Sequence, residues 1–258
     1  MQVVTIASGS KGNCSLISDG KTNILIDAGI SMRRIVSALS SLGLAPRDIC
    51  GVLITHEHSD HISGLKMLEK YHGLDIIAPS PLCEVLARAC PEAKPYLRSL
   101  PEDDKSAIGS FAVSCFRTQH DAAYSVGYRI EGDEIFGLAT DTGCVTDEIF
   151  RGLEGADIAL IEANHDIDML KNGPYPYYLK QRILSNKGHL SNSDSGKLAS
   201  ALAKGGTKHI ILGHLSHENN TPRIALETVG AAVGDDCRDI RIAPQNEMLR
   251  LETDLCSL

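Results

Sequence analysis

Short apolar runs alternate with turn residues along the chain, and this pattern predicts most of its regular structure. Runs rich in β-branched and aromatic residues, bounded by Gly, Asp and Asn, predict strands over residues 23–27, 51–55, 111–116, 135–139 and 209–212. Apolar residues at helical spacing predict helices over residues 62–71, 81–90, 193–203 and 222–233. Strands that alternate with amphipathic helices are typical of an α/β fold.

The organisation of the chain favours one domain over residues 1–258. Neither an internal repeat nor a low-complexity linker interrupts the pattern. Folds of the α/β class reach this length as one unit around one large core. Hydrophobic residues make up 43% and charged residues 22% of the chain, a composition that supports such a core and excludes a disordered or fibrous protein.

Composition also limits location and partners. Residues 1–7 lack the basic start of a secretory signal, and no run reaches the roughly 18 apolar residues of a membrane span. The eight cysteines are scattered, which favours reduced thiols in the cytoplasm over a disulfide framework or a thiolate zinc site. The net charge of −8 excludes overall attraction to nucleic acid, so a polyanion must meet a local basic patch.

Histidine or aspartate follows four of the five predicted strands. These residues are His56, His120, Asp141 and His214. Loops at strand ends are where a rigid sheet presents functional groups, so we expect these side chains to belong to a site. Taken singly, His120 could be a turn histidine and Asp141 an Asx-turn residue; His217 is a rival to His214, which we prefer because it directly follows the strand.

The densest motif is Thr-His-Glu-His-Ser-Asp-His over residues 55–61, which contains His56, His58, Asp60 and His61. Imidazole and carboxylate are the preferred ligands of zinc, iron and manganese, and several on one turn can face two ions. A zincin motif would need histidine at position 60 and is excluded. The alternative is a polar surface loop.

The pattern His-x-His-x-Asp-His over residues 56–61 resembles the first ligand motif of the metallo-β-lactamase fold superfamily. The resemblance covers essentially the whole chain, because residues 27, 120, 140–143 and 214 match the family's other motifs. It implies an αββα sandwich of two mixed β-sheets flanked by helices. It also implies two divalent metal ions, one held by His56, His58 and His120, the other by Asp60, His61 and His214, with Asp141 bridging them.

Two divalent ions about 3.5–4 Å apart lower the pKa of a shared water toward roughly 7 and thereby supply a bridging hydroxide at neutral pH. Asp60 could orient that hydroxide. Asp27 is more plausibly a residue that fixes a ligand loop by hydrogen bonds than a ligand itself.

Asp141 narrows the choice of hydrolase. β-Lactamases of this fold usually carry cysteine at that position, whereas glyoxalase II-like thioester hydrolases and tRNase Z-like phosphodiesterases carry aspartate. Glu162 and His189 resemble the pair that, in the tRNase Z-like enzymes, protonates the leaving group. An alkoxide leaving group needs such an acid, while a thiolate with a pKa of about 8.5 scarcely does. The alternative for His189 is a structural place before the helix over residues 193–203.

A second feature also favours phosphodiesterases. Residues 171–187 contain four basic residues, no acidic ones and three of the seven tyrosines. Aromatic and cationic side chains together stack bases and neutralise phosphates, which predicts that Tyr177, Tyr178, Lys180 and Arg182 bind substrate. A surface loop or an oligomer contact is the alternative.

Within the superfamily, residues 7–15, 188–192 and 214–220 resemble the compact WalJ (YycJ) group of bacterial proteins. This resemblance implies a 5′ to 3′ DNA exonuclease linked to DNA repair, and it adds Ser10, His217 and Asn220 to the predicted substrate-binding residues. DNA is favoured over RNA, and zinc, manganese and iron stay open as the metal. Small-molecule phosphodiesterases, thioester hydrolases and a non-catalytic nucleic-acid-binding module are the alternatives; every ligand position is filled, which argues against the last.

Overall fold

Two seven-stranded sheets lie against each other in the computed structural model, which describes residues 1–237 and 239–253. The first has the order β14-β1-β2-β3-β4-β5-β6 and the second β13-β12-β11-β10-β9-β8-β7. The strands of the first are β1 (Gln2–Ala7), β2 (Cys14–Ser18), β3 (Asn23–Ile26), β4 (Gly51–Leu53), β5 (Ile76–Pro79), β6 (Leu97–Leu100) and β14 (Leu249–Glu252). Those of the second are β7 (Ser106–Ile108), β8 (Phe111–Arg117), β9 (Val126–Glu131), β10 (Ile135–Ala139), β11 (Ile158–Glu162), β12 (His209–Gly213) and β13 (Asp239–Ile242).

Both sheets are mixed. Antiparallel pairing joins β14, β1, β2 and β3, after which β3 to β6 run parallel. The second sheet repeats this scheme, with β7 to β10 antiparallel and β10 to β13 parallel. Parallel neighbours need crossover connections, and these supply the helices.

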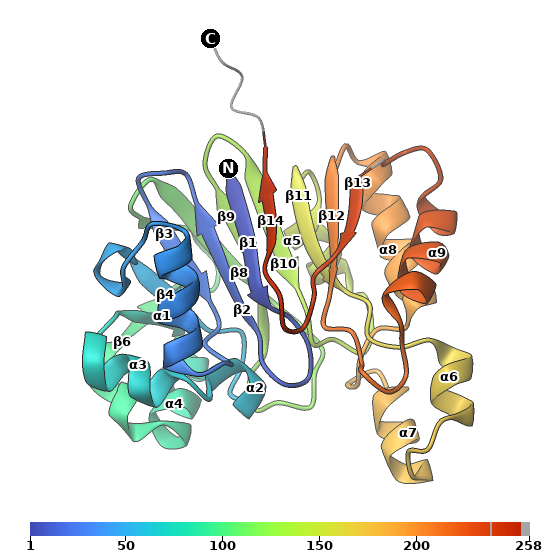
Figure 1. Ribbon diagram of the computed structural model, residues 1–258, viewed down its shortest axis with the longest axis horizontal. Coiled ribbons are helices and arrows are strands. Elements are labelled where there is room, and N and C mark those ends of the chain that lie inside the picture. The colour runs from blue at the N-terminus through green and yellow to red at the C-terminus, as the bar shows by residue number, and fades with distance from the viewer. Residues whose placement is uncertain (238, 254–258) are drawn as a thin grey trace.

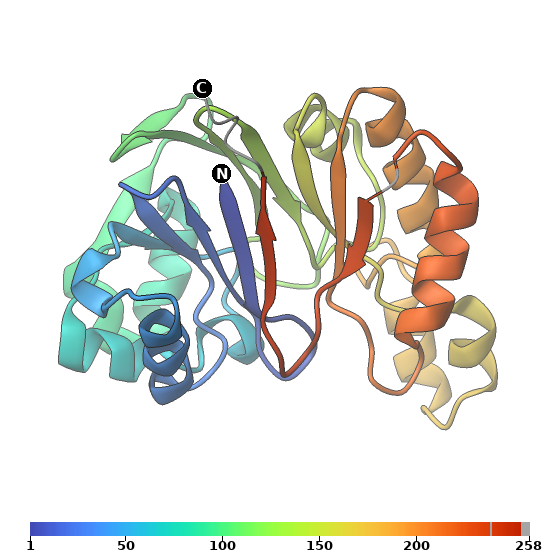
Figure 2. The same cartoon turned by 45° about the horizontal axis from the view of Figure 1, so that its top comes forward.

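Helices cover the outer faces of both sheets (Figures 1 and 2). The helices of the described chain are α1 (Met32–Ser41), α2 (Ser59–Ile62), α3 (Leu65–His72), α4 (Ser80–Ala89), α5 (Asp147–Leu153), α6 (Ile167–Asn172), α7 (Tyr177–Ile183), α8 (Asn192–Lys204) and α9 (Pro222–Val233), with 3₁₀ turns η1 (Pro46–Asp48) and η2 (Pro91–Tyr96). Helices α1, α3 and α4 flank the first sheet, and α8 and α9 flank the second (Figure 1). The predicted αββα sandwich is confirmed. No described helix is long and apolar enough to cross a membrane.

Strand β11 illustrates how the sequence positions the layers. Ile158 and Leu160 join the core between the sheets, whereas Ala159 and Ile161 belong to the second core, which includes residues of α5, α8 and α9. Successive side chains of a strand point to opposite faces, so a continuous apolar run is buried on both. The rigid strand then ends in a polar residue, Glu162, whose side chain is fully buried.

The predicted helix over residues 62–71 is divided into α2 and α3. The N–H of Gly64 donates to the carbonyl of Ala28 at 2.8 Å, outside the helical pattern. A Cβ at position 64 would stand 2.0 Å from the Ile30 carbonyl oxygen, so only glycine fits this approach. The break sets the short helix α2, which carries Asp60 and His61, against the loop after β3.

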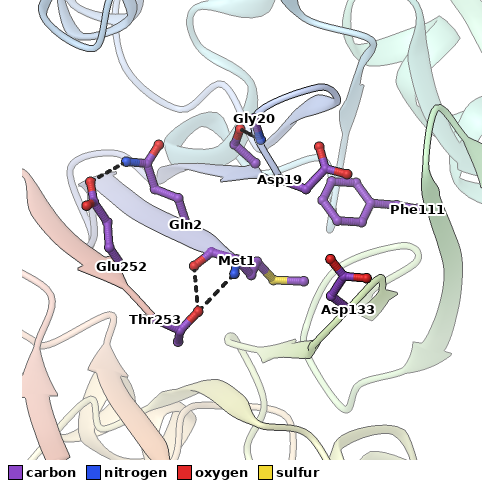
Figure 3. A pocket seen from close by; sticks show the side chains of 9 residues that line it. Met1, Gln2, Asp19, Gly20, Phe111, Asp133, Glu252 and Thr253 are labelled. Atoms are coloured by element: carbon purple, nitrogen blue, oxygen red, sulfur yellow. Dashed lines mark hydrogen bonds between the residues drawn. The ribbon is translucent and has the colours of Figure 1, made fainter. Parts of the chain in front are cut away.

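The N-terminus lies at the end of β1 opposite the loops described below. The amine of Met1 donates to Glu134 Oε2 at 2.6 Å. It also donates to Thr253 Oγ1 at 2.8 Å, beside a cavity of about 440 Å³ (Figure 3). Phe111 and Asp133 line this cavity, and it contains no cluster of metal-binding side chains among the described residues.

Glu69 in α3 is a buried acid remote from those loops. Its exposed fraction is 1%, and neither carboxylate oxygen has a hydrogen-bond partner among the described residues. Burial, and to a lesser extent the Asp75 carboxylate, raises the pKa of Glu69 to about 7. The unfolded-state pKa is about 4.3, so the folded state holds the extra proton between these values. Its contribution to stability is therefore present below about pH 4.3 and lost as the pH rises through 7.

We expect Glu69→Gln to increase the free energy of unfolding at pH 8 by up to about 3 kcal/mol and to change it far less at pH 5, because glutamine needs no proton. Urea denaturation of both proteins across this pH range measures the difference. Glu84→Gln, at an exposed position of α4, is the control and should show no such pH dependence. A constant offset between wild type and Glu69→Gln would contradict the assignment.

Candidate metal centre and active site

Loops from both sheets converge at one end of the sandwich. The residues that follow or end their strands there are Asp27 after β3, His56 after β4, His120 after β8, Asp141 after β10, Glu162 at the end of β11 and His214 after β12. Parallel strands place their carboxyl ends at the same edge, which is why segments far apart in sequence meet here.

Three of these residues have a left-handed backbone. Asp27, Asp141 and His214 have φ values of 62°, 56° and 54°, and no other described residue except glycine has a positive φ. This conformation costs an L-residue roughly 1–2 kcal/mol and persists only where surrounding contacts impose it. The N–H of Asp27 donates to Leu53 O and that of His214 to Ser8 Oγ, each at 2.8 Å. The strained residues of the described chain thus lie at the ends of three strands that meet at this site.

All seven predicted metal ligands are brought together. Their side-chain nitrogen and oxygen atoms fall into overlapping groups within 4.8 Å, namely His56 with His58 and His120, Asp60 with His61 and His214, and Asp141 with His56 and His61. Asp141 also groups with Glu162, His189 and His214. The position of Asp141 between the groups is the one that a bridging carboxylate needs.

Hydrogen bonds orient the imidazoles through the ring nitrogen that faces away from the cluster. His61 Nδ1 lies 2.7 Å from Asp27 Oδ2, and His120 Nδ1 lies 3.1 Å from the carbonyl of Gly188. A carboxylate or carbonyl at Nδ1 fixes the proton there and directs the Nε2 lone pair into the cluster. This geometry agrees with the expectation that Asp27 fixes a ligand by a hydrogen bond and is not a ligand itself.

Buried atoms without partners show that the donor set fits a cation. Nε2 of His56, Nε2 of His214 and Oδ2 of Asp141 are buried and accept no hydrogen bond within the described chain. An unsatisfied buried polar atom costs about 1–3 kcal/mol. Imidazole nitrogens and carboxylate oxygens that converge in this way suit divalent metals, which would satisfy these atoms.

The protonation of the imidazoles reflects this crowding. Burial, with the neighbouring imidazoles, lowers the pKa of His56 well below its ordinary value and keeps it neutral. Burial also lowers the pKa of His61, but the carboxylates of Asp27 and Asp141 outweigh burial and raise it to about 9. Because a metal ligand must be unprotonated, a cation that binds His61 displaces a proton.

Glu162 is the hub of the site. Its Oε1 lies 2.7 Å from His189 Nδ1 and 2.9 Å from His214 Nδ1, while its Oε2 accepts the N–H groups of Thr142 at 3.0 Å and Leu190 at 3.2 Å. Burial raises the pKa of this carboxyl, but the His189 imidazole and the hydrogen bonds outweigh burial and hold it well below its usual range. The sequence predicted the pairing with His189; the pairing with His214 is an addition.

His189 lies over the cluster. Its ring centroid is 5.0 Å from that of His120 and 5.2 Å from that of His214. Burial lowers its pKa, but the Glu162 carboxylate outweighs burial and raises the pKa above its ordinary value. With Nδ1 held by Glu162, Nε2 is the nitrogen that can offer a proton to a bound molecule.

The predicted substrate-binding residues are divided in space. Ser10 and Arg182 line a cavity of about 180 Å³ together with His189. Tyr177 and Tyr178 begin α7 and are 76% and 74% exposed, which leaves both rings accessible. In Figure 1, α7 and α6 project from the body of the sandwich at the edge where the loops converge.

Three other predicted residues have structural partners instead. Lys180 Nζ donates to the carbonyls of Lys171 and Gly173 at 2.7 Å each, so it closes the end of α6. Asn220 is buried, and its amide joins the carbonyls of Ala163 and Asn164 and the side chain of Asn192.

His217 is exposed, lies 3.3 Å from Glu218 and is absent from the cavity wall. We therefore do not carry Lys180, Asn220 or His217 into the proposed substrate-binding set. A sequence pattern gives the chemistry of such side chains, but it cannot reveal that their polar atoms already form hydrogen bonds to the backbone.

Two residues that contact the predicted metal ligands, Thr55 and Asn13, were not predicted from the sequence to do so. Thr55 Oγ1 donates to Asp27 and lies 3.1 Å from Nδ1 of both His56 and His61, so it locks the loop that precedes the ligands. Asn13 Nδ2 lies 3.0 Å from His61 Nε2 and 3.3 Å from the Asp60 carbonyl. Thr55 begins the dense motif and Asn13 lies in the segment over residues 7–15 that resembles the WalJ group, but neither signal specifies these contacts.

Comparison with known proteins adds sequence relatives to this geometry. A family model described as a beta-lactamase superfamily domain matches residues 22–215. The exodeoxyribonuclease WalJ of Streptococcus pneumoniae is 39% identical over 233 residues, which are 87% of this chain and 85% of that protein. The exodeoxyribonuclease YycJ of Bacillus anthracis is 35% identical over 241 residues, 89% of this chain and 90% of that protein.

Among solved structures, the metallo-beta-lactamase fold protein YhfI from Bacillus subtilis is similar with a TM-score of 0.74. The sequences are 17% identical, and the match covers 97% of this chain and 99% of that one. This likeness concerns the fold alone, and it extends over both sheets and their helices.

Proposed function

The chain belongs to the metallo-β-lactamase fold superfamily, in the group that contains WalJ and YycJ, and from this premise we propose that it is a metal-dependent exonuclease that hydrolyses DNA from 5′ ends. The observation that carries the proposal is the buried Glu162–His189 pair beside the ligand cluster. Relatives named exodeoxyribonucleases support the substrate class. The free thiols of the described cysteines accord with a cytoplasmic location, which is part of the proposal.

We propose two divalent ions in two half-sites, one formed by His56, His58 and His120 and the other by Asp60, His61 and His214, with Asp141 between them. When bound, they lower the pKa of water and neutralise charge on the phosphate. The ligand chemistry admits zinc, manganese or iron.

Asp60 is proposed to orient the attacking water. Its Oδ2 lies 3.7 Å from His61 Nε2 and 3.6 Å from His214 Nε2, and 23% of its side chain is exposed, so it borders the open side of the cluster. Burial raises the pKa of this carboxyl, but the neighbouring imidazoles of His214 and His61 outweigh burial and hold it well below its usual range. An ionised carboxylate in this place accepts a hydrogen bond from water and thereby directs a lone pair of the water oxygen at the phosphorus.

His189 is proposed to protonate the departing oxygen. Glu162 accepts its Nδ1–H and favours the protonated ring, so Nε2–H points away from the carboxylate. An alkoxide is a poor leaving group that gains from this proton, whereas a thiolate gains little. The pair therefore favours a phosphodiesterase over a thioester hydrolase.

A comparison of two small substrates tests this choice. We expect the metal-loaded protein to hydrolyse a chromogenic phosphodiester and to leave a glutathione thioester intact. Preferential turnover of the thioester would reject the phosphodiesterase and support the glyoxalase II-like alternative. Asp141→Asn serves as the control for contaminating activity.

The exposed tyrosines of α7 are proposed to stack bases of the strand. We expect the double variant Tyr177→Ala and Tyr178→Ala to bind single-stranded DNA about ten- to a hundredfold more weakly, because stacking contributes about 1–3 kcal/mol per base. Fluorescence anisotropy of a labelled oligonucleotide measures the change. The matched control is Tyr71→Ala in α3, whose ring is 58% exposed away from α7. Equal losses in both variants would reject the stacking role.

A further inference from the structure

We call the cavity beside His189 the end pocket. Its wall includes Ser10, Asp121, Tyr175, Leu179, Arg182 and His189. These residues come from the loops after β1 and β8, from α7 and the turn before it, and from the loop that leads into α8. The end pocket therefore borders the imidazole that is proposed to donate the proton.

The volume of the end pocket limits its occupant. At about 180 Å³ it is somewhat larger than an apolar cavity of about 150 Å³ that holds benzene. One ring or one sugar-phosphate unit can enter, but a run of nucleotides cannot. Helix α7 closes one side with Tyr175, Leu179 and Ile183.

Two contacts hold α7 in place although none of its residues is buried. Arg182 Nε donates to Asp121 Oδ2, and Lys180 binds the carbonyls at the end of α6. The wall is thus fastened directly to the residue that follows His120. Deformation of this wall to admit a longer strand would break the ion pair.

The polar lining contains hydrogen-bond donors for an anion and one carboxylate, Asp121, which is paired with Arg182. Arg182 carries the only Lys or Arg charge on the described wall, and its two terminal nitrogens have no protein hydrogen-bond partner within the described chain. Ser10 and Ser216 add hydroxyl donors. Guanidinium and hydroxyl groups together match the oxygens of a phosphate monoester.

We propose that the end pocket receives the 5′-phosphate and sugar of the single terminal nucleotide that leaves the strand, with the phosphate on Arg182 and the sugar ring against Tyr175 and Leu179. This proposal rests on the proposed function and deepens it. Since His189 serves the leaving oxygen, the part of the substrate attached to that oxygen lies on the His189 side, which is the end pocket.

The terminal nucleotide leaves in one hydrolytic step. A water oxygen forms a bond to phosphorus, the bond from phosphorus to the 3′-oxygen of the terminal nucleotide breaks, and that oxygen takes its proton from His189. The water proton passes to the solvent. The shortened strand keeps a 5′-phosphate, so each cycle regenerates the end that Arg182 recognises, and the product is a mononucleotide.

Binding of thymidine 5′-monophosphate and of thymidine to the metal-loaded protein tests the end pocket without turnover. We expect wild type to prefer the monophosphate, and Arg182→Gln to lose about ten- to a hundredfold of that preference. Arg223→Gln is the matched control, because Arg223 is an exposed arginine paired with Glu227 on α9. Leu179→Trp should weaken both ligands by filling the volume. An unchanged preference in Arg182→Gln, or an equal loss in Arg223→Gln, would overturn the proposal.

A kinetic comparison separates this inference from the proposed function. We expect wild type to show a higher kcat/KM for 5′-phosphorylated than for 5′-hydroxyl oligonucleotides, and Arg182→Gln to lose the difference. If no oligonucleotide is cleaved, the proposed function fails. If both are cleaved equally by wild type, the nuclease stands and the end pocket is rejected. If folding of Leu179→Trp fails in circular dichroism, the Arg182→Gln result alone decides.

Discussion

Replacement of His189 with alanine is expected to lower kcat on DNA by about 10²- to 10⁴-fold, the usual loss when a general acid is removed. Metal content should stay near wild type, because His189 is not one of the seven predicted metal ligands and its Nδ1 is hydrogen-bonded to Glu162. Metal analysis and steady-state kinetics measure both quantities. His217→Ala, an exposed histidine, is the control.

Leaving groups of different acidity make this prediction decisive. A nitrophenolate departs with little protonation, so the defect of His189→Ala should shrink sharply on a nitrophenyl phosphodiester. A structural role for His189 would instead lower the rate on both substrates by the same factor. Equal defects would therefore remove the main support for the proposed phosphodiesterase.

Glu162 contacts both His189 and His214, so we expect Glu162→Gln to differ from His189→Ala in its effect on bound metal. Because Glu162 holds both His189 and the predicted ligand His214, Glu162→Gln should reduce the rate and also weaken retention of metal. His189→Ala should reduce the rate alone. The contrast in metal content distinguishes a carboxylate that orients two imidazoles from one that serves a single imidazole.

Asp141→Ala is expected to lose metal from both half-sites and activity by orders of magnitude while the chain stays folded. Asp141 belongs to groups on both sides of the cluster, and its Oδ2 has no other partner within the described chain. Inductively coupled plasma mass spectrometry measures metal ions per chain, and circular dichroism checks the fold.

A second variant guards against a backbone effect at this position. The φ of Asp141 is 56°, which asparagine tolerates better than alanine. Asp141→Asn should therefore preserve the turn and still lose metal. Two ions retained per chain in Asp141→Asn would reject the bridging role, and unchanged metal in Asp168→Asn, an exposed site in α6, is the control.

The sequence predicted the strands and helices that depend on local residue patterns. The strands that precede His56, Asp141 and His214 are continuous apolar runs, and their ends stand within two residues of the predicted positions. Helix α9 (Pro222–Val233) matches its predicted range because Thr221 caps it and Pro222 begins it. The dense motif required no long-range information, since its ligands share one loop and one short helix.

The remaining features depend on contacts that no local pattern contains. Strand β14 pairs with β1 from the other end of the chain, and such pairing is not encoded near either strand. The dual role of Glu162 arises because β11 and β12 are parallel neighbours, which places His214 beside it. The residue types of Lys180 and Asn220 favour substrate binding, but the side-chain nitrogens of both donate to backbone carbonyls in the fold.

The most direct test of the central claim follows the products of DNA hydrolysis. The protein, loaded separately with zinc, manganese or iron, is incubated with linear DNA labelled at the 5′ end and with circular single-stranded DNA. The proposed mechanism predicts release of the label as a mononucleotide from the first cycle, an intact circle, and loss of both the label release and bound metal in Asp141→Asn. Cleavage of the circle, or labelled products that first appear as long fragments, would contradict a 5′ exonuclease whose pocket accepts one terminal nucleotide.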